Sequence, residues 1–262
     1  MDPSQLRSKI RTKFWTGPTS GTCKGYLQAN LVILPQLWMN EFLQYCHLNS
    51  QPLPVLGHGK VGDPRVDILA KDSDIRHDVA KYWVYRNGIL EQTALDIQNL
   101  WEDDWVWALL GCSFSTEIVL ENAGIHLWHL EHGKNVPMYR TKLETTPTPR
   151  WSGELVVSMR WINTEQVSLA KSITSQFPLA HGAPVAIGFS NSLGIDNIAR
   201  PEWGDFYKPP IDDVVPVFWA CGVTSQSAII RSRPPIAITH APGHMFVSDW
   251  PVDKICNLTT IE

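Results

Sequence analysis

Short apolar runs bounded by glycine or proline constrain the fold of this 262-residue chain more than any other feature. Residues 184–187, 215–220 and 235–239 are apolar and rich in β-branched side chains. They do not alternate between apolar and polar residues, which is typical of strands that are buried on both faces. Because helical patterns lie between them, we predict a mixed α and β fold.

The remaining segments contain recognisable helix and hairpin patterns. A hairpin is predicted over residues 81–93, because Asn87 and Gly88 suit a tight turn between two strands. The other predictions are helices over 4–13 with Ser4 as N-cap, 35–46, 96–110, 116–122 closed by a left-handed Gly124, and 164–176 with a threonine cap, strands over 136–141 and 154–160, and a loop over 50–66. We predict one catalytic unit over residues 1–262, with a smaller α+β lobe within it around 75–150.

Charge and apolar content exclude several classes of protein. Lysine and arginine number 22 against 26 aspartate and glutamate residues, so the formal charge is 22 − 26 = −4, and no basic cluster occurs. A nucleic-acid binder held by phosphate contacts would need such a cluster. With 44% hydrophobic and 18% charged residues, the chain is unlike a disordered one. No apolar stretch reaches the roughly 20 residues that cross a bilayer, so we expect no membrane partner.

Cysteine usage and the N-terminal segment indicate a reducing compartment. The five cysteines are odd in number and widely spaced, unlike a disulfide framework or a metal-binding finger. The first 15 residues lack the apolar core of a secretory signal. We predict a cytoplasmic protein. The mitochondrial matrix is the alternative, because the N-terminal segment is amphipathic and contains arginine.

Tryptophan is unusually frequent, with 12 residues spread from Trp15 to Trp250. Such side chains pack well in a core or at the interface of a homo-oligomer. A stacking platform for a sugar or a base is the alternative.

Residues 110–117 form a first candidate site, at the end of an apolar run. Ligands bind at strand ends in open α/β sheets, and free backbone N–H groups before a helix suit a carboxylate. The same field would favour the thiolate of Cys112. The alternative is a helix cap by Ser115 or Thr116 beside a buried, inert Cys112.

Residues 218–226 form a second candidate of the same kind. Gly222 permits close approach of the backbone to a ligand, and the Thr224 hydroxyl can donate to an anion. The alternative is a plain turn with a threonine or serine cap.

Two histidines in residues 239–245 are candidate proton carriers near neutral pH. His240 and His244 are four residues apart, but the Pro-Gly pair between them opposes a helix, so a loop presenting two imidazoles fits better. A structural role for each is the alternative. His181, just before another apolar run, is a weaker candidate.

Other polar residues carry weaker signals. Arg140 and Arg160 lie within apolar strand segments, where each either pairs with a buried carboxylate or binds an anionic ligand through its planar fork. His126, His129 and His132 are spaced by three, so only neighbouring members would share a helix face. We predict that these histidines hold no metal.

Several segments, in order along the chain, resemble the D-glutamate cyclase family, whose members are also described as hydro-lyases. They are Gly-Pro-Thr-Ser-Gly at 17–21, Gly-Tyr-Leu-Gln-Ala-Asn-Leu at 25–31, Leu-Gly-Cys-Ser-Phe-Ser at 110–115, Asn-Val-Pro-Met-Tyr-Arg-Thr at 135–141, Val-Val-Ser-Met-Arg at 156–160, His-Gly-Ala-Pro-Val at 181–185, Pro-Val-Phe-Trp-Ala-Cys-Gly-Val-Thr at 216–224 and Thr-His-Ala-Pro-Gly-His-Met at 239–245. The resemblance runs from about residue 17 to residue 249.

The resemblance implies an enzyme that interconverts D-glutamate and 5-oxo-D-proline plus water. It also implies two intertwined lobes with mixed sheets flanked by helices, and no cofactor for the cyclisation. The implied partner is the substrate, a small acidic metabolite. A hydro-lyase acting on another small amino or hydroxy acid is the alternative.

The sequence departs from the family pattern at several positions. After Val185 the family usually has His-Ile-Gly-Asp-Pro, whereas this chain has Ala186 and Phe189 where the His and Asp would stand. Trp161 and Ser225 replace two prolines. If the missing pair serves catalysis, the protein has changed its substrate or binds an acidic metabolite without turnover.

Lactam formation requires a base for the amine, an electrophilic γ-carboxyl group and stabilisation of the tetrahedral oxyanion. We assign the proton transfers to His240 and His244. We assign stabilisation of the oxyanion to Ser113, Ser115 and Thr224. We assign binding of the substrate to Arg140, Arg160 and His181. Cys112 or Cys221 could instead attack to form a thioester. We rank this second, because a folded, bound substrate already gains from proximity.

Overall fold

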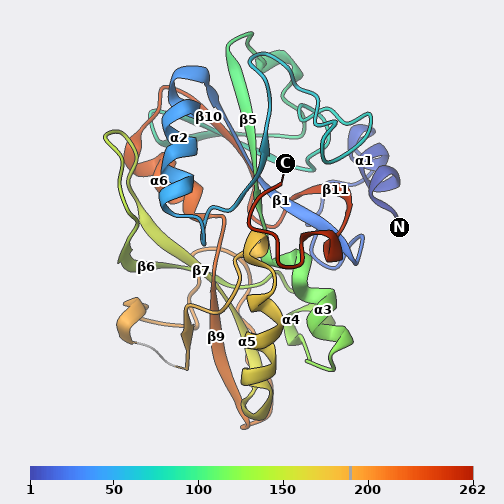
Figure 1. The fold of residues 1–262 in the computed structure, drawn as a ribbon, viewed down its shortest axis with the longest axis vertical. Helices are drawn as coiled ribbons and strands as arrows, with labels where there is room; N and C mark the ends of the chain where they lie inside the picture. Colours follow the sequence, from blue (N-terminus) through green and yellow to red (C-terminus); the bar gives the residue numbers. More distant parts are fainter. Residues whose placement is uncertain (189–190, 262) are drawn as a thin grey trace.

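Two β-sheets, one above the other in Figure 1, organise the molecule. The computed structural model describes residues 1–188 and 191–261, and the strand pairings among them are all antiparallel. The seven-stranded sheet has the order β2-β5-β1-β10-β3-β4, with β11 also paired to β1, and the four-stranded sheet has the order β6-β7-β9-β8. The mixed α and β prediction is confirmed, but the sheets are antiparallel rather than mixed.

The strands and helices have well-defined bounds. The strands are β1 Tyr26–Pro35, β2 Val55–His58, β3 Tyr82–Arg86, β4 Ile89–Ala94, β5 Trp105–Gly111, β6 Met138–Glu144, β7 Glu154–Asn163, β8 Ala186–Ile187, β9 Val214–Ala220, β10 Ala237–His240 and β11 Phe246–Pro251. The helices are α1 Pro3–Arg11, α2 Gln36–Leu48, α3 Glu117–Asn122, α4 Trp128–Glu131, α5 Val167–Ser175 and α6 Thr224–Ser232, with 3-10 helices η1 Gln98–Leu100, η2 Ser113–Thr116, η3 Thr164–Gln166, η4 Pro178–Ala180, η5 Asn191–Leu193 and η6 Val252–Ile255. None of the helices in the described ranges is long and apolar enough to cross a membrane.

The four-stranded sheet is an insertion into the seven-stranded one. Strands β1 to β5 belong to the upper sheet, the chain then passes to the lower sheet for β6 to β9, and it returns through α6 to add β10 and β11. The chain therefore crosses between the sheets twice, at residues 111–116 and 221–224. Each crossing is a segment that the sequence marks as a candidate site.

Strands β9 and β10 are buried on both faces, as their apolar runs predict, whereas the run at 184–187 forms only the short edge strand β8, with Ile187 48% exposed. In β9, Val217 and Trp219 pack against the side covered by α3 and α5, whereas Phe218 packs against Tyr139 and Met159 on the opposite side. Strand β10 divides its side chains between two cores in the same way. The rule for parallel α/β sheets, in which ligands bind at the strand ends, does not apply, because these sheets are antiparallel.

The helix predicted over residues 96–110 is wrong. A short 3-10 turn is followed by strand β5, which pairs with β1 and β2. Trp105 and Trp107 fill one core, while Val106 and Ala108 fill the other. Because both faces are apolar, the strand lacks the alternation that would have distinguished it from a buried helix.

Smaller predictions at the ends of elements need correction. The N-cap of α1 is Asp2, whose carboxylate accepts from the Gln5 N–H at 2.9 Å, and not Ser4. The predicted threonine cap is absent from the start of α5, which follows the 3-10 turn η3. Strand β2 lies within the predicted loop. The hairpin turn is confirmed, with φ of 51° at Asn87 and 78° at Gly88.

Helix α1 is tied to two distant parts of the chain. Arg7 donates to the Val247 carbonyl at 2.9 Å and pairs with Asp249 at 2.8 Å, both on β11. Arg11 pairs with Asp78 at 2.6 Å, and the Asp78 side chain is fully buried. These contacts fix the position from which residues 12–22 enter the body of the molecule.

Tryptophan serves largely in packing. Five of the tryptophans are buried: Trp105, Trp107, Trp151, Trp161 and Trp219. Trp151 contacts the rings of Trp38, Phe42 and Tyr45, with centroids 4.9–6.3 Å apart. The core-packing interpretation therefore accounts for these side chains.

Candidate functional site

The two crossings between the sheets lie side by side, joined by a buried asparagine of β1. The Asn30 amide donates to the Gly111 carbonyl, with an Nδ2–O distance of 2.6 Å. A Cβ added to Gly222 would lie 2.1 Å from the same amide nitrogen. Cys112 and Cys221, next to these glycines, pack in one apolar cluster. Only glycine at position 222 leaves room for Asn30 to reach the first crossing.

Residues 239–245 approach the crossings from the upper sheet. Met245 belongs to the same apolar cluster as the two cysteines. Thr19, in the N-terminal Gly-Pro-Thr-Ser-Gly segment, donates its N–H to the Gly243 carbonyl at 2.8 Å and accepts from the Met245 N–H at 3.0 Å. Four segments that the sequence singled out are thus brought together, although they are far apart along the chain.

A buried network of charges lies beside the first crossing. Arg160 of β7 pairs with Glu117 at the start of α3, with an Nη2–Oε1 distance of 2.6 Å. It also donates to Ser113 Oγ at 3.1 Å and to Ser158 Oγ at 3.3 Å. His129 donates through Nε2 to the same Glu117 oxygen at 3.0 Å. All five side chains are buried.

Four of the five N–H donors of Arg160 have partners within the described chain, which are Glu117 and two serines. Each of the three guanidinium nitrogens of Arg160 donates to Glu117 or to a serine. Burial alone would raise the pKa of Glu117, but the positive charges of Arg160 and His129 hold that pKa below its ordinary value. Arg160 thus pairs with a buried carboxylate, one of the two alternatives for it, and has no free fork for a substrate carboxylate.

The two histidines of residues 239–245, here called the histidine loop, differ from this network, because each has a buried ring nitrogen without a partner in the described part of the chain. His240 is the last residue of β10, contrary to the expected loop position, and His244 lies in the loop that follows. The Leu31 N–H lies 3.1 Å from His240 Nδ1, and the Leu31 carbonyl lies 3.4 Å from the same atom; the shorter contact, in which Nδ1 accepts, places the proton of the neutral ring on Nε2. His244 Nδ1 donates to the Pro242 carbonyl at 3.0 Å, so its Nε2 is a free acceptor. Neither Nε2 has a hydrogen-bond partner among the described residues.

Both loop histidines are held in the neutral form. Burial lowers the pKa of His240 to about 4 and also lowers the pKa of His244. The charge of a protonated His244 is a further, smaller reason for His240 to stay neutral, and the charge of Lys81 is one for His244. The pair therefore offers one unused donor and one unused acceptor.

A cavity of about 560 Å³ lies beside the histidine loop. Its wall consists of Trp15, Gly17, Pro18, Ser20, Gly21, Thr22, Lys24, Leu130, Gly133, Lys134 and Asn135. Lys24 pairs with Glu121 at 2.8 Å, whereas Lys134 has no ion pair within the described ranges. Ser20 Oγ and Asn135 Oδ1 are buried and have no hydrogen-bond partner in the part of the chain that the structure describes. Cationic side chains and unused polar atoms suit a small anion.

The cavity wall is continuous with the histidine loop and with the charged network. A Cβ on Gly243 would lie 2.5 Å from Asn135 Nδ2, so the asparagine packs directly on the residue before His244. A second void of about 10 Å³ shares Gly21 and Lys24 with the cavity and reaches Glu117. That volume is about enough for one water molecule.

The two cysteines at the crossings are buried thiols. Burial raises the pKa of Cys112, and it raises the pKa of Cys221 to about 11. Cys112 Sγ accepts from the Phe114 N–H at 3.5 Å. The inert alternative for Cys112 therefore describes its surroundings better than an activated thiolate.

The hydroxyls predicted to bind an oxyanion are engaged with the backbone. Ser115 Oγ accepts from the Gln28 N–H at 2.9 Å, and Thr224 Oγ accepts from the Val156 N–H at 3.0 Å. Thr224 also donates to the Cys221 carbonyl at 2.7 Å. Both hydroxyls are therefore structural, but neither is the helix cap that the alternative named, because α3 and α6 have no side-chain cap within the described ranges.

Two other predicted residues lie away from the histidine loop. Arg140 is exposed, and its guanidinium lies 5.8 Å from the ring of Trp203 rather than in a buried pair. His181 is buried and faces a different cavity, beneath α2. Their roles in binding substrate remain predictions.

Two departures from the family pattern, Ala186 and Trp161, fall on the far face of the lower sheet, whereas Ser225 lies in α6 at the second crossing, where its Oγ donates to the Gly222 carbonyl at 2.8 Å. Ala186 and Trp161 pack with Phe218, whereas Arg160 faces Trp219 on the opposite side. Alternate residues of a strand face opposite ways, so these changes leave the charged network intact. Phe189 lies outside the described residues.

Sequence reasoning missed the roles of Glu117 and His129. The histidine spacing does not give a shared site: His126 pairs with Glu131 at 2.9 Å, whereas His132 is exposed. Across the described residues, no three His, Cys, Asp or Glu side chains are placed to hold a metal ion. The sequence offered one signal for the pair of Glu117 and Arg160. Glu117 directly follows Ser-Phe-Ser-Thr, and Arg160 lies in an apolar strand segment, where it needs a partner.

The sequence was compared with known families and curated proteins. The D-glutamate cyclase family matches residues 106–249. Proteins whose names begin "Putative hydro-lyase" are similar over nearly the whole chain. One from Paraburkholderia phymatum is 48% identical over 249 residues, covering 95% of this chain and 96% of its own length. One from Bacillus licheniformis is 47% identical over 249 residues, covering 95% of each chain.

Proposed function

This chain belongs to the D-glutamate cyclase family, and from that premise we propose that it is a hydro-lyase that interconverts D-glutamate and 5-oxo-D-proline plus water. Relatives that share nearly half of its residues over 95% of its length carry hydro-lyase names. The substrate and its stereochemistry are our inference from the family and from the chemistry of the cavity.

The observation that supports the proposal most is the meeting of the cationic cavity with the histidine loop. The cavity of about 560 Å³ is of a size that takes small metabolites. Lys24 and Lys134 provide charge opposite to the two carboxylates of glutamate. Ser20, Asn135 and His244 each have an unused polar atom at or directly behind its inner wall. A small dianionic substrate would use these groups.

In the proposed reaction, His244 starts the proton transfers. Its free Nε2 takes a proton from the substrate ammonium group, and the amine then attacks the γ-carboxyl carbon. The new C–N bond gives a tetrahedral oxyanion, to which the His240 Nε2–H can donate. The C–O bond then breaks. The two protons lost by nitrogen leave with that oxygen as water, and the reverse sequence opens the lactam.

A thioester route through Cys112 or Cys221 is less well supported. Its first step needs a thiolate, and burial raises the pKa of both thiols. Direct attack by the amine needs only the neutral imidazoles that the loop already provides.

The test is a substrate assay with an isotope readout. Purified protein is incubated separately with D-glutamate, L-glutamate and 5-oxo-D-proline in H₂¹⁸O, with and without divalent metal, and the products are followed by chiral mass spectrometry. We expect lactam opening to place one ¹⁸O in the γ-carboxylate of D-glutamate, and L-glutamate to remain unchanged. Absence of turnover in every arm would overturn the proposed activity.

Two other outcomes would point to the alternatives. Turnover of a different small amino or hydroxy acid would retain the hydro-lyase class and change the substrate. Tight binding of D-glutamate without turnover, measured by calorimetry, would indicate a binding protein, as the departures at Ala186 and Phe189 allow.

A further inference from the structure

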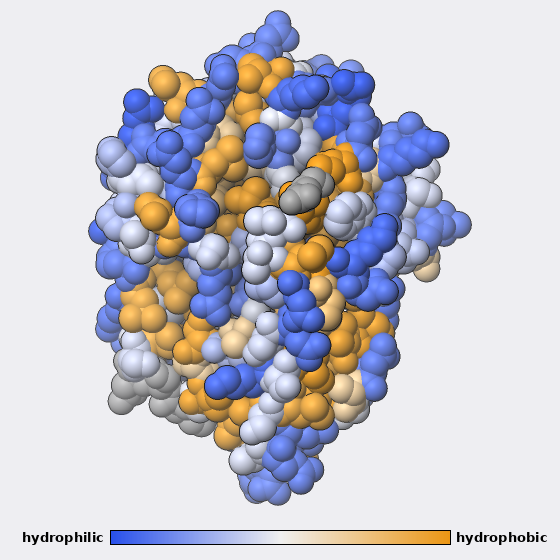
Figure 2. All heavy atoms as spheres, viewed as in Figure 1, coloured by the Kyte–Doolittle hydropathy of each residue, from blue (hydrophilic) through white to orange (hydrophobic). Residues whose placement is uncertain are grey.

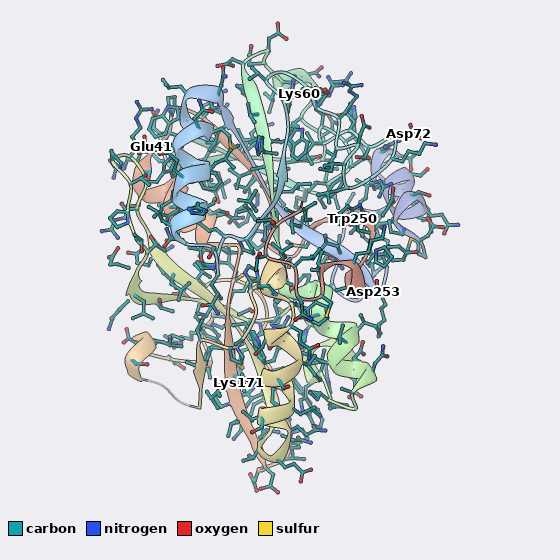
Figure 3. The ribbon with its side chains drawn as sticks, in the orientation of Figure 1. Glu41, Lys60, Asp72, Lys171, Trp250 and Asp253 are labelled. Carbon is teal, nitrogen blue, oxygen red and sulfur yellow. The ribbon has the colours of Figure 1, made fainter. Side chains whose placement is uncertain are left out.

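A second cavity of about 560 Å³ lies beneath α2, separate from the cationic one. It is enclosed by the C-terminal half of α2, residues 50–58, the segment 175–183 and residues 259–260. Figure 2 shows apolar surface between α2 and the C-terminal segment on this face of the molecule. In Figure 3, Glu41 marks α2 and Lys171 marks α5, the two helices on either side. Its volume lies within the range of small-molecule sites.

The titratable side chains in the lining of this cavity are three histidines, His47, His58 and His181, and Cys46. Its apolar wall includes Leu43, Leu53, Val55 and Leu179, and none of the described residues around it is Asp, Glu, Lys or Arg. A charged ligand would lose its hydration here without gaining an ionic partner, which is costly. The contrast with Lys24 and Lys134 in the other cavity indicates a ligand of a different class. An uncharged, largely apolar molecule fits best.

One wall of the cavity is held rigidly by hydrogen bonds. His181 has a φ of 76°, in the left-handed region that non-glycine residues rarely adopt. Its Nδ1 lies 2.9 Å from the Gln51 carbonyl, and the Gln51 amide donates to the His181 and Ala183 carbonyls at 3.2 and 3.0 Å. A strained residue fixed in this way is typical of preformed binding sites. Burial lowers the pKa of His181 to about 4, so this wall is also neutral.

The same wall packs directly against the first crossing between the sheets. The Gly111 N–H donates to the Pro54 carbonyl at 2.9 Å. A Cβ on Gly111 would lie 1.6 Å from the Leu179 carbonyl oxygen. Pro54 and Leu179 both line the cavity. A ligand that shifts either one must therefore displace Gly111, directly before Cys112 and Ser113.

We infer that the cavity beneath α2 is a second ligand site, which takes an uncharged, largely apolar small molecule and transmits its occupancy to residues 111–117. The binding claim stands apart from the proposed enzymatic activity, because it rests on a different cavity. A ligand bound here would act on the charged network through Gly111 rather than by contact with substrate.

Fluorescence titration of the purified protein tests binding. Nile red, an uncharged apolar dye, is compared with 1-anilinonaphthalene-8-sulfonate, an anionic one. We expect one Nile red per chain, bound at least about tenfold more tightly than the anionic dye, the factor that 1.4 kcal/mol represents. Absence of saturable Nile red binding, or equal affinity for the two dyes, would overturn the proposal.

Matched variants locate the dye. Leu43→Glu places a charge on the cavity side of α2, and Leu169→Glu places the same charge on α5, where Leu169 is 44% exposed and does not line the cavity. We expect only the first to weaken Nile red binding, by about tenfold or more. If Leu43→Glu does not fold, Ser50→Glu at the exposed rim replaces it. Equal binding by the cavity variant and the control would contradict the assignment.

Hydrogen exchange tests the transmission. With Nile red bound, we expect slower exchange of the backbone amides in residues 111–117 and no change in the distant hairpin of β3 and β4. Saturable binding with unchanged exchange in residues 111–117 would overturn the coupling and leave the ligand site standing.

Discussion

The buried network around Arg160 and the histidine loop contain similar polar side chains, but only one of them is complete. The Arg160 guanidinium nitrogens and the Glu117 carboxylate have partners within the protein, while His240 and His244 each keep an unused ring nitrogen. Buried polar groups are normally satisfied, so the unsatisfied pair needs an explanation that the satisfied network does not. The difference suggests that the network holds the crossing in place and that the loop meets the substrate.

The largest effect on turnover should come from changing the histidine loop. His244→Ala removes the proposed base, and we expect turnover of D-glutamate to fall by roughly 10²- to 10⁴-fold. The thermal midpoint should change little, because His244 has one hydrogen bond, to the nearby Pro242 carbonyl. Steady-state kinetics and a melting curve measure the two quantities. His132→Ala, at an exposed histidine, is the control, and full turnover by His244→Ala would exclude this residue as the base.

Breaking the complete network should affect folding. Glu117→Ala leaves the Arg160 charge buried without its partner, and we expect the free energy of unfolding to fall by about 3–5 kcal/mol. Urea denaturation measures the loss. Glu121→Ala, also on α3, removes the exposed pair with Lys24 and should cost less than about 1 kcal/mol. Similar losses in both variants would show that the network contributes no more than a surface ion pair.

Acid should lower the free energy of unfolding, because two buried histidines are neutral in the folded protein. The folded pKa of both His240 and His181 is about 4, below the ordinary 6.5, so the unfolded chain binds more protons between these values. Stability therefore falls as the pH drops from about 6.5 to 4, by about 3 kcal/mol for each histidine. Urea denaturation at a series of pH values gives the slope. His240→Gln and His181→Gln should flatten it and His132→Gln should not; unchanged slopes in all three would contradict the assignment.

The smallest effect is expected at the thiols. Cys112→Ala and Cys221→Ala should each change turnover by less than about tenfold, whereas loss of a true nucleophile costs several orders of magnitude. Single-turnover kinetics with mass spectrometry of the intact protein would detect a thioester. A trapped acyl adduct on either cysteine would reverse the ranking of the two routes.

Sequence reasoning succeeded where one segment contains the whole signal. Strands β9 and β10 were predictable because their apolar runs are buried on both faces, and the closeness of His240 and His244 because both lie within five residues; the catalytic role of the two histidines stays a prediction. It failed at β5, since an apolar strand without alternation has the same composition as a buried helix.

The charged network was not predictable for a different reason. Glu117 and Arg160 are 43 residues apart, and His129 lies on a third element between them. Their pairing depends on the lower sheet being inserted between two crossings, a topology that no local pattern encodes. The sequence could raise a buried carboxylate partner for Arg160 as one alternative, but it could not say which carboxylate.

The ion pairs that hold α1 link this helix to binding in the cationic cavity. Residues 15–24 form one wall of the cationic cavity, and they follow a helix held by Arg7 and Arg11. Release of this helix would loosen the start of that wall, before the anchor of Thr19 on the histidine loop, so an occupant that contacts it reinforces the helix by the same free energy that the helix lends to the occupant. Cleavage by a protease near residue 13 would thus be slower when the cavity is occupied. A bulky tag fused before Asp2 would weaken binding in the cavity.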